Sequence, residues 1–276
     1  MFFKQICPLI LLLLTFALPN SSMADHSWGK YKWKPSSIPF NLDLVDNVNL
    51  DWEGNLLLAS GDWSVSTVLG TTVVSGSTDP ISCDPRSGNI QVCNAAYGDT
   101  GWLGVAQIYG RGTTITAGVA MLNDTYYATG YANGYYDTPA WRRMVMCQEI
   151  AHTFGLAHQD ETFDNVNLGT CMDYTDDPDG TIGGESSNEY PNQHDYDQLE
   201  AIYGGSKVDK EDGGCNPKSP KCNSVASYPG NSAHGHAQWG RLVSGHGGVE
   251  TYEKDLGNGI KLITHVIWTL EHADNH

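Results

Sequence analysis

One stretch of the sequence places histidine and carboxylate side chains at helical spacing. It reads Gln148-Glu149-Ile-Ala-His152-Thr-Phe-Gly155-Leu-Ala-His158. On a helix, residues 148 and 152 lie one turn apart and project the same way, with residue 149 beside them. A glycine at position 155 allows a sharp turn that can bring His158 back toward His152. Two imidazoles and a carboxylate then converge on one point, as a catalytic zinc with an open coordination position requires.

The stretch resembles the signature of the metzincin zinc endopeptidases, H-E-x-x-H-x-x-G-x-x-H, which is followed by a turn that contains methionine. Cys171-Met172-Asp173-Tyr174 supplies such a turn, with Met172 fourteen residues after His158. The resemblance covers residues 40–205 and implies a matrixin-like catalytic domain that acts on proteins or peptides. It also implies that Met172 forms an apolar floor beneath the metal and that Tyr174 reaches the zinc or the reacting carbonyl.

The same resemblance assigns the chemistry and the substrate strand. Zinc would activate a water molecule, Glu149 would accept its proton as general base and pass it to the leaving amine, and Tyr174 would hydrogen-bond the oxyanion. The segment Trp102 to Tyr109 resembles the edge strand on which metzincins align a peptide in antiparallel fashion.

The sequence departs from the family at the first metal ligand, where Gln148 replaces histidine. An amide oxygen is a neutral and weaker donor than imidazole, so three hypotheses stay open. Gln148 ligates zinc in a weakened site; or the metal is held by His152, His158 and an outside donor such as Tyr174 or water; or no metal binds. The last hypothesis makes the chain a catalytically inactive binding module, a pseudoprotease, and it is the alternative to the endopeptidase.

The beginning of the chain predicts export. Lys4 precedes an apolar run from Ile6 to Leu18, and Ser22-Met23-Ala24 offers small residues for cleavage. We therefore expect residues 1–24 to be a signal peptide and the mature protein to be secreted. Six cysteines then remain, an even number that favours disulfides. Their neighbours in sequence suggest the pairs Cys83–Cys93, Cys215–Cys222 and Cys147–Cys171.

The charge excludes several classes of partner. Lys plus Arg number 15 against 32 Asp plus Glu, a formal net charge of −17. Such a chain is repelled by phosphate backbones and anionic lipid surfaces, so we expect no nucleic-acid partner and no membrane association after the signal peptide is removed. We expect a monomer.

Apolar patterning predicts an α+β fold with a twisted mixed sheet and two principal helices. The active-site helix runs from Ala140 to Phe154 after Thr138 and Pro139, and a closing helix runs from His194 to Tyr203. Strands are expected over 64–69, 71–74, 102–109 and 113–122, and a hairpin around Gly257-Asn-Gly259. The predicted units are an extended segment 25–49, the catalytic domain 50–205, a linker 206–234 and a small β-rich tail 235–276.

Two further sets of side chains have plainer explanations. The acidic run Asp173, Asp176, Asp177 and Asp179 could hold calcium, but its spacing is irregular and a solvated loop is favoured. The tail is rich in histidine, without fixed spacing to acids or cysteines, and scattered surface histidines are the expectation: His234, His236, His246, His265, His272 and His276.

Overall fold

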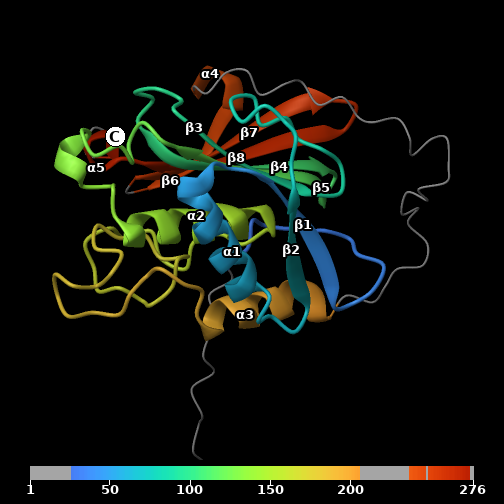
Figure 1. Cartoon of the computed structure of the whole chain (residues 1–276). Helices are drawn as coiled ribbons and strands as arrows, with labels where there is room; N and C mark the ends of the chain where they lie inside the picture. Colours follow the sequence, from blue (N-terminus) through green and yellow to red (C-terminus); the bar gives the residue numbers. More distant parts are fainter. Residues whose placement is uncertain (1–25, 206–235, 247, 274–276) are drawn as a thin grey trace, which may run out of the picture.

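The computed structural model describes residues 26–205, 236–246 and 248–273, and a single mixed sheet runs through them (Figure 1). The sheet has eight strands in the order β2-β1-β3-β5-β4-β8-β7-β6. The strands are β1 Phe40–Asn47, β2 Leu69–Ser75, β3 Ile90–Ala95, β4 Trp102–Arg111, β5 Thr114–Asn123, β6 Arg241–His246, β7 Val249–Gly257 and β8 Ile260–Trp268. The predicted signal peptide, the predicted linker, Cys215 and Cys222 lie outside the described residues.

The sheet has a parallel half and an antiparallel half. β2, β1, β3 and β5 pair in parallel, whereas β5–β4, β4–β8, β8–β7 and β7–β6 are antiparallel pairs. The helices are α1 Leu50–Trp63, α2 Pro139–Thr153, α3 Gln193–Leu199, α4 His236–Trp239 and α5 Leu270–Ala273, with a π-helical turn at Glu200–Gly204 after α3. α1, α2 and α3 lie on the same side of the sheet (Figure 1). The α+β class with a mixed sheet is confirmed, and no helix within the described ranges is long and apolar enough to span a bilayer.

The prediction of two principal helices was wrong, because α1 is a third. Asn49 caps it by accepting a hydrogen bond from the Asp51 amide at 3.0 Å. Its buried side includes Trp52, Leu56 and Trp63, while other leucines of the same helix are exposed. Because apolar residues occur on both sides of α1 and two glycines interrupt it, the helical period is weak in the sequence.

Two strand predictions also change at this end of the chain. The expected strand over 64–69 is a turn, and β2 begins only at Leu69. The segment 25–49 was expected to be merely extended, but it contains β1, which pairs on both sides with parallel neighbours. The predicted strand over 71–74 lies within β2.

The helix predicted over 140–154 is confirmed as α2. Thr138 accepts a hydrogen bond from the Trp141 amide at 3.2 Å, and Pro139 occupies the first turn. The helix ends before Gly155, whose φ of 96° only glycine adopts without strain. A Cβ atom at this position would lie 2.5 Å from the Tyr31 carbonyl oxygen, so the chain turns here in close contact with another segment.

The C-terminal segment continues the main sheet. Because of this, the prediction that β4 is an edge strand was wrong. β7 and β8 form the predicted hairpin. β8 in turn pairs antiparallel with β4 from Trp102 to Arg111. β4 is therefore an interior strand, with β5 on one side and β8 on the other, and not the open edge that the resemblance implied.

Two of the predicted disulfides are present. Cys83 is bonded to Cys93, at a sequence separation of 10, and Cys147 to Cys171, at a separation of 24. The second bond joins α2 to the turn that carries Met172, as expected. It therefore fixes the helix that carries Glu149 and His152 to the loop beside it.

Removing the longer disulfide should destabilise the fold more than removing the shorter one. For Cys147→Ser/Cys171→Ser we expect a loss of about 3 kcal/mol in the free energy of unfolding, because a larger loop regains more chain entropy when it is opened. Urea unfolding measures this loss, with Cys83→Ser/Cys93→Ser as the matched control. An unchanged midpoint in the first variant would contradict the expectation.

Candidate metal centre

α2 and the turn after it bring together the two histidines of the motif. His152 lies in the last turn of α2 and His158 follows the bend at Gly155. Their ring centroids are 4.8 Å apart. Both side chains are buried, so the convergence expected from the spacing is present in the structure.

A third histidine, His265 of β8, completes the cluster. Its ring centroid lies 3.9 Å from that of His152 and 4.5 Å from that of His158. One potential ligand atom from each of the three residues lies within 4.8 Å of the others. His265 is only 2% exposed, so the expectation that it is a surface histidine was wrong. The sequence did contain a sign that His265 is buried, since the apolar residues Ile263 and Ile267 lie on the same face of the strand.

The hydrogen bonds of the two motif histidines leave one nitrogen of each ring available for a metal. His152 Nδ1 donates to the Leu156 carbonyl at 2.8 Å, and His158 Nδ1 lies 3.4 Å from a Glu161 carboxylate oxygen. The Nε2 atoms of both residues, and Nδ1 of His265, are buried without a hydrogen-bond partner. Unpaired buried nitrogens that face each other fit a zinc ion, and the outer hydrogen bonds are those that orient metal-binding imidazoles.

Burial also favours the neutral form that binds metal. It lowers the pKa of His152 and of His265 well below the ordinary value, and neighbouring histidines lower both further. A neutral imidazole keeps the lone pair that coordination needs.

Gln148 is buried next to the cluster but differs from a histidine in its bonding. Its Nε2 donates to the Cys171 carbonyl at 2.6 Å, while its Oε1 has no hydrogen-bond partner. The amide is therefore fixed with its oxygen available. The third side chain that the structure brings to His152 and His158 is His265.

Glu149 is fully buried and neither of its carboxylate oxygens has a hydrogen-bond partner. Burial raises the pKa of this carboxyl well above the ordinary value for glutamate. The opposite wall is Gly104 of β4, where an added Cβ would lie 2.5 Å from Glu149 Oε1. A strongly perturbed carboxyl beside a histidine cluster is typical of a functional site.

The turn with Met172 and Tyr174 lies against the segment after His158. The Gln159 amide donates to the Met172 carbonyl at 2.6 Å, and Met172 is fully buried. The Tyr174 hydroxyl is buried and donates to the backbone carbonyl of Trp268, the last residue of β8, at 2.9 Å. Tyr174 thus bonds a peptide carbonyl, although that carbonyl belongs to the same chain.

Trp28 is a further residue of the site that the sequence analysis missed. Its ring stacks on His152 with centroids 5.2 Å apart and planes 3° from parallel, and it lies 5.6 Å from the ring of His265. Its segment is held by a hydrogen bond from the Trp28 amide to the Gly155 carbonyl at 2.8 Å. An indole on this side shields the cluster from water.

The other candidate ligand groups take part in hydrogen bonds, although one carboxylate oxygen of Asp195 and one of Asp173 are buried without a partner. His26 lies near His194 and Asp195, but its two ring nitrogens are each 3.0 Å from a partner, Ala157 O and His194 Nδ1. In the acidic run, carboxylates of Asp173, Asp177 and Asp179 accept hydrogen bonds within their loop. Among the described residues, neither of the two groups of potential metal ligands contains a residue of that run. The structure therefore gives no support for a calcium site there.

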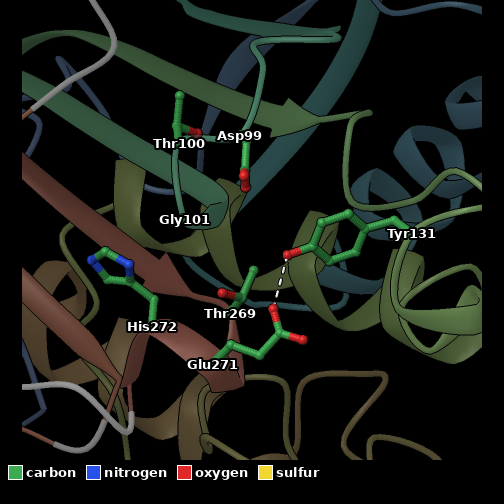
Figure 2. A pocket seen from close by; sticks show the side chains of 7 residues that line it. All are labelled: Asp99, Thr100, Gly101, Tyr131, Thr269, Glu271 and His272. Atoms are coloured by element: carbon green, nitrogen blue, oxygen red, sulfur yellow. Dashed lines mark hydrogen bonds between the residues drawn. The ribbon is translucent and has the colours of Figure 1, made fainter.

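A cavity of about 250 Å³ lies near the start of β4 and the end of β8, and it is separate from the cluster. Figure 2 shows its lining, with the Tyr131 hydroxyl hydrogen-bonded to Glu271 at 3.0 Å across it. The lining consists of Asp99, Thr100, Gly101, Tyr131, Thr269, Glu271 and His272. None of the three clustered histidines faces this cavity, so it gives no access to them.

A side chain at Gly104 should disturb the site. We expect Gly104→Ala to lower the free energy of unfolding by about 2 kcal/mol, because the methyl group overlaps Glu149 and Val145. Gly54→Ala in α1 is the matched control; it meets no atom within 4 Å and should raise stability by about 0.5 kcal/mol or more. Thermal and urea unfolding of the two variants decide the point, and equal stabilities would contradict the close packing.

Comparison with known proteins adds little to this geometry. The chain matches no protein-family model, and no curated protein is significantly similar in sequence. One solved structure similar to it is high choriolytic enzyme 1, a hatching enzyme zinc-protease from the medaka fish Oryzias latipes, at 13% identity. The match covers 63% of this chain and 94% of that one, with a TM-score of 0.33. A similarity at this level leaves the function to be argued from the site itself.

Proposed function

We propose that the chain is an exported zinc-dependent endopeptidase of metzincin type. The observation that carries the proposal is the set of buried, unpaired imidazole nitrogens of His152, His158 and His265 beside the buried carboxyl of Glu149. His152, His158 and His265 would hold the ion, and Gln148 Oε1 is a further available donor. Bound zinc would acidify a water molecule and polarise a peptide carbonyl.

The chain's own residues supply the remaining roles. Glu149 would accept a proton from the attacking water and deliver it to the leaving amine, and burial, which raises the pKa of this carboxyl, makes its carboxylate a stronger base than an exposed one. Tyr174 would hold a peptide carbonyl, as its hydroxyl does with Trp268. The Cys147–Cys171 disulfide would keep the helix and the Tyr174 loop in fixed relation.

One observation favours the binding module as second candidate. Gln148 is anchored to the Cys171 carbonyl, and the histidine cluster is buried. Zinc bound without any peptide hydrolysis, in every form of the chain, would support that alternative.

Zinc content tests the metal site directly. We expect about one zinc per wild-type chain after dialysis, and at least a 100-fold weaker affinity in His152→Ala, because one of few ligands is lost. His272→Ala is the control, since His272 lies outside both groups of potential metal ligands among the described residues. Elemental analysis and chelator competition measure both. An affinity in His152→Ala equal to that of wild type would rule out this site.

Hydrolysis tests the role of Glu149. Glu149→Gln keeps the size of the side chain but cannot accept a proton, so cleavage of an internally quenched peptide should fall by about 1,000-fold while zinc stays bound. Glu53→Gln, on an exposed side of α1, controls for removal of one carboxylate. If the control hydrolyses the peptide measurably, an equal rate in Glu149→Gln would mean that Glu149 is not the base.

A further inference from the structure

β8 takes the place in which the resemblance puts a peptide substrate. It lies antiparallel to β4, and its register brings His265 opposite Ala106. An extended peptide that binds by strand addition makes the same kind of ladder with a sheet edge. Here the ladder is intramolecular and runs the full length of β4.

The side chains of β8 that face α2 fill the space around the metal centre. Ile263, His265 and Ile267 alternate along the strand on this face, and all three are buried. Their partners on β4 are Ile108, Ala106 and Gly104. The two small partners leave room for His265 to reach the other histidines and for Glu149 to approach β4.

A backbone contact agrees with this arrangement. The Tyr174 hydroxyl, which the resemblance assigns to a substrate carbonyl, donates to the carbonyl of Trp268 in β8. β8 therefore provides an antiparallel ladder, a side chain in the metal cluster and a carbonyl acceptor for Tyr174. A peptide substrate bound in the cleft would make the same three kinds of contact.

We propose that β8 is a built-in occupant of the peptide cleft, which keeps the enzyme latent through the β4–β8 ladder and the His265 imidazole. The inference rests on the proposed function and names its regulation and its substrate class. With β8 displaced, His152, His158 and Gln148 remain to hold zinc, and β4 is open to an extended peptide. Ile263 and Ile267 lie two residues before and after His265. We therefore expect the cleft to prefer a peptide with apolar side chains two residues before and two residues after the residue that faces the metal.

The test loosens β8 in the full-length chain. Thr264→Pro interrupts the β8 ladder, and Ser244→Pro is the matched control in β6, which pairs with β7 and not with β8. The probe is a fluorescent synthetic peptide with the sequence of residues 260–268, and binding is followed by anisotropy. We expect Thr264→Pro to bind this peptide at least about tenfold more tightly than wild type or Ser244→Pro, because its cleft is open for a larger fraction of the time.

The role of His265 has its own control within the same assay. A probe with alanine in place of His265 should bind Thr264→Pro at least about tenfold more weakly than the natural probe when zinc is present, and equally well when zinc is removed. Failure of Thr264→Pro to gain peptide binding, or gain without any effect of the histidine, would overturn the inference. Hydrogen exchange in β5, which does not pair with β8, confirms that the variant is folded.

A second variant covers the case in which Thr264→Pro does not fold. His265→Ala keeps the strand, and we expect its zinc affinity to fall at least about tenfold. His272→Ala, on α5 and outside the trio, should bind zinc as wild type does. Unchanged affinity in His265→Ala would overturn the inference.

Activity separates this inference from the proposed function. We expect Thr264→Pro to cleave an internally quenched apolar peptide at least about tenfold faster than wild type, in a manner that depends on Glu149. A variant that binds zinc and the probe but never cleaves would refute the endopeptidase while β8 remains the cleft occupant. A wild-type chain that cleaves as fast as Thr264→Pro would refute latency while the endopeptidase stands.

Discussion

Three imidazole nitrogens that face one another in the protein interior impose a constraint on the whole chain. A buried polar atom without a partner costs about 1–3 kcal/mol, and three of them close together also disfavour any proton that would satisfy one of them. The surrounding structure must therefore hold them in place or supply a ligand that they share. α2, the bend at Gly155 and β8 each bring one histidine, and Trp28 covers the group.

Local signals predicted the part of this arrangement that lies close together in the sequence. Thr138 and Pro139 set the start of α2, and Gly155 set its end, so the positions of Glu149, His152 and His158 followed from helical geometry. The pairing of Cys147 with Cys171 also followed, because the other cysteines had nearer neighbours. The assignment of catalytic roles to these residues stays a prediction.

Contacts between distant segments could not be predicted in the same way. His265 lies in a strand whose partner is fixed by sheet register, and register depends on the whole set of paired strands. The sequence did not predict α1, because its apolar residues occur on both its buried and its exposed sides and give no clear helical period. The sequence of β4 is apolar and would suit an edge strand or an interior strand equally well. It therefore does not predict whether another strand pairs with the side of β4 that faces away from β5.

The distance along the chain between the clustered histidines has a consequence for how the protein is made. His152 and His158 are synthesised well before His265, and the described strands β6, β7 and β8 join the sheet only through β4. Contacts between residues far apart in sequence form late, because closing a long loop loses chain entropy before any contact compensates for it. The histidine cluster is therefore among the last features of the fold to close. Until it does, a growing chain exposes the β4 edge, and His152 and His158 lack the imidazole of His265 beside them.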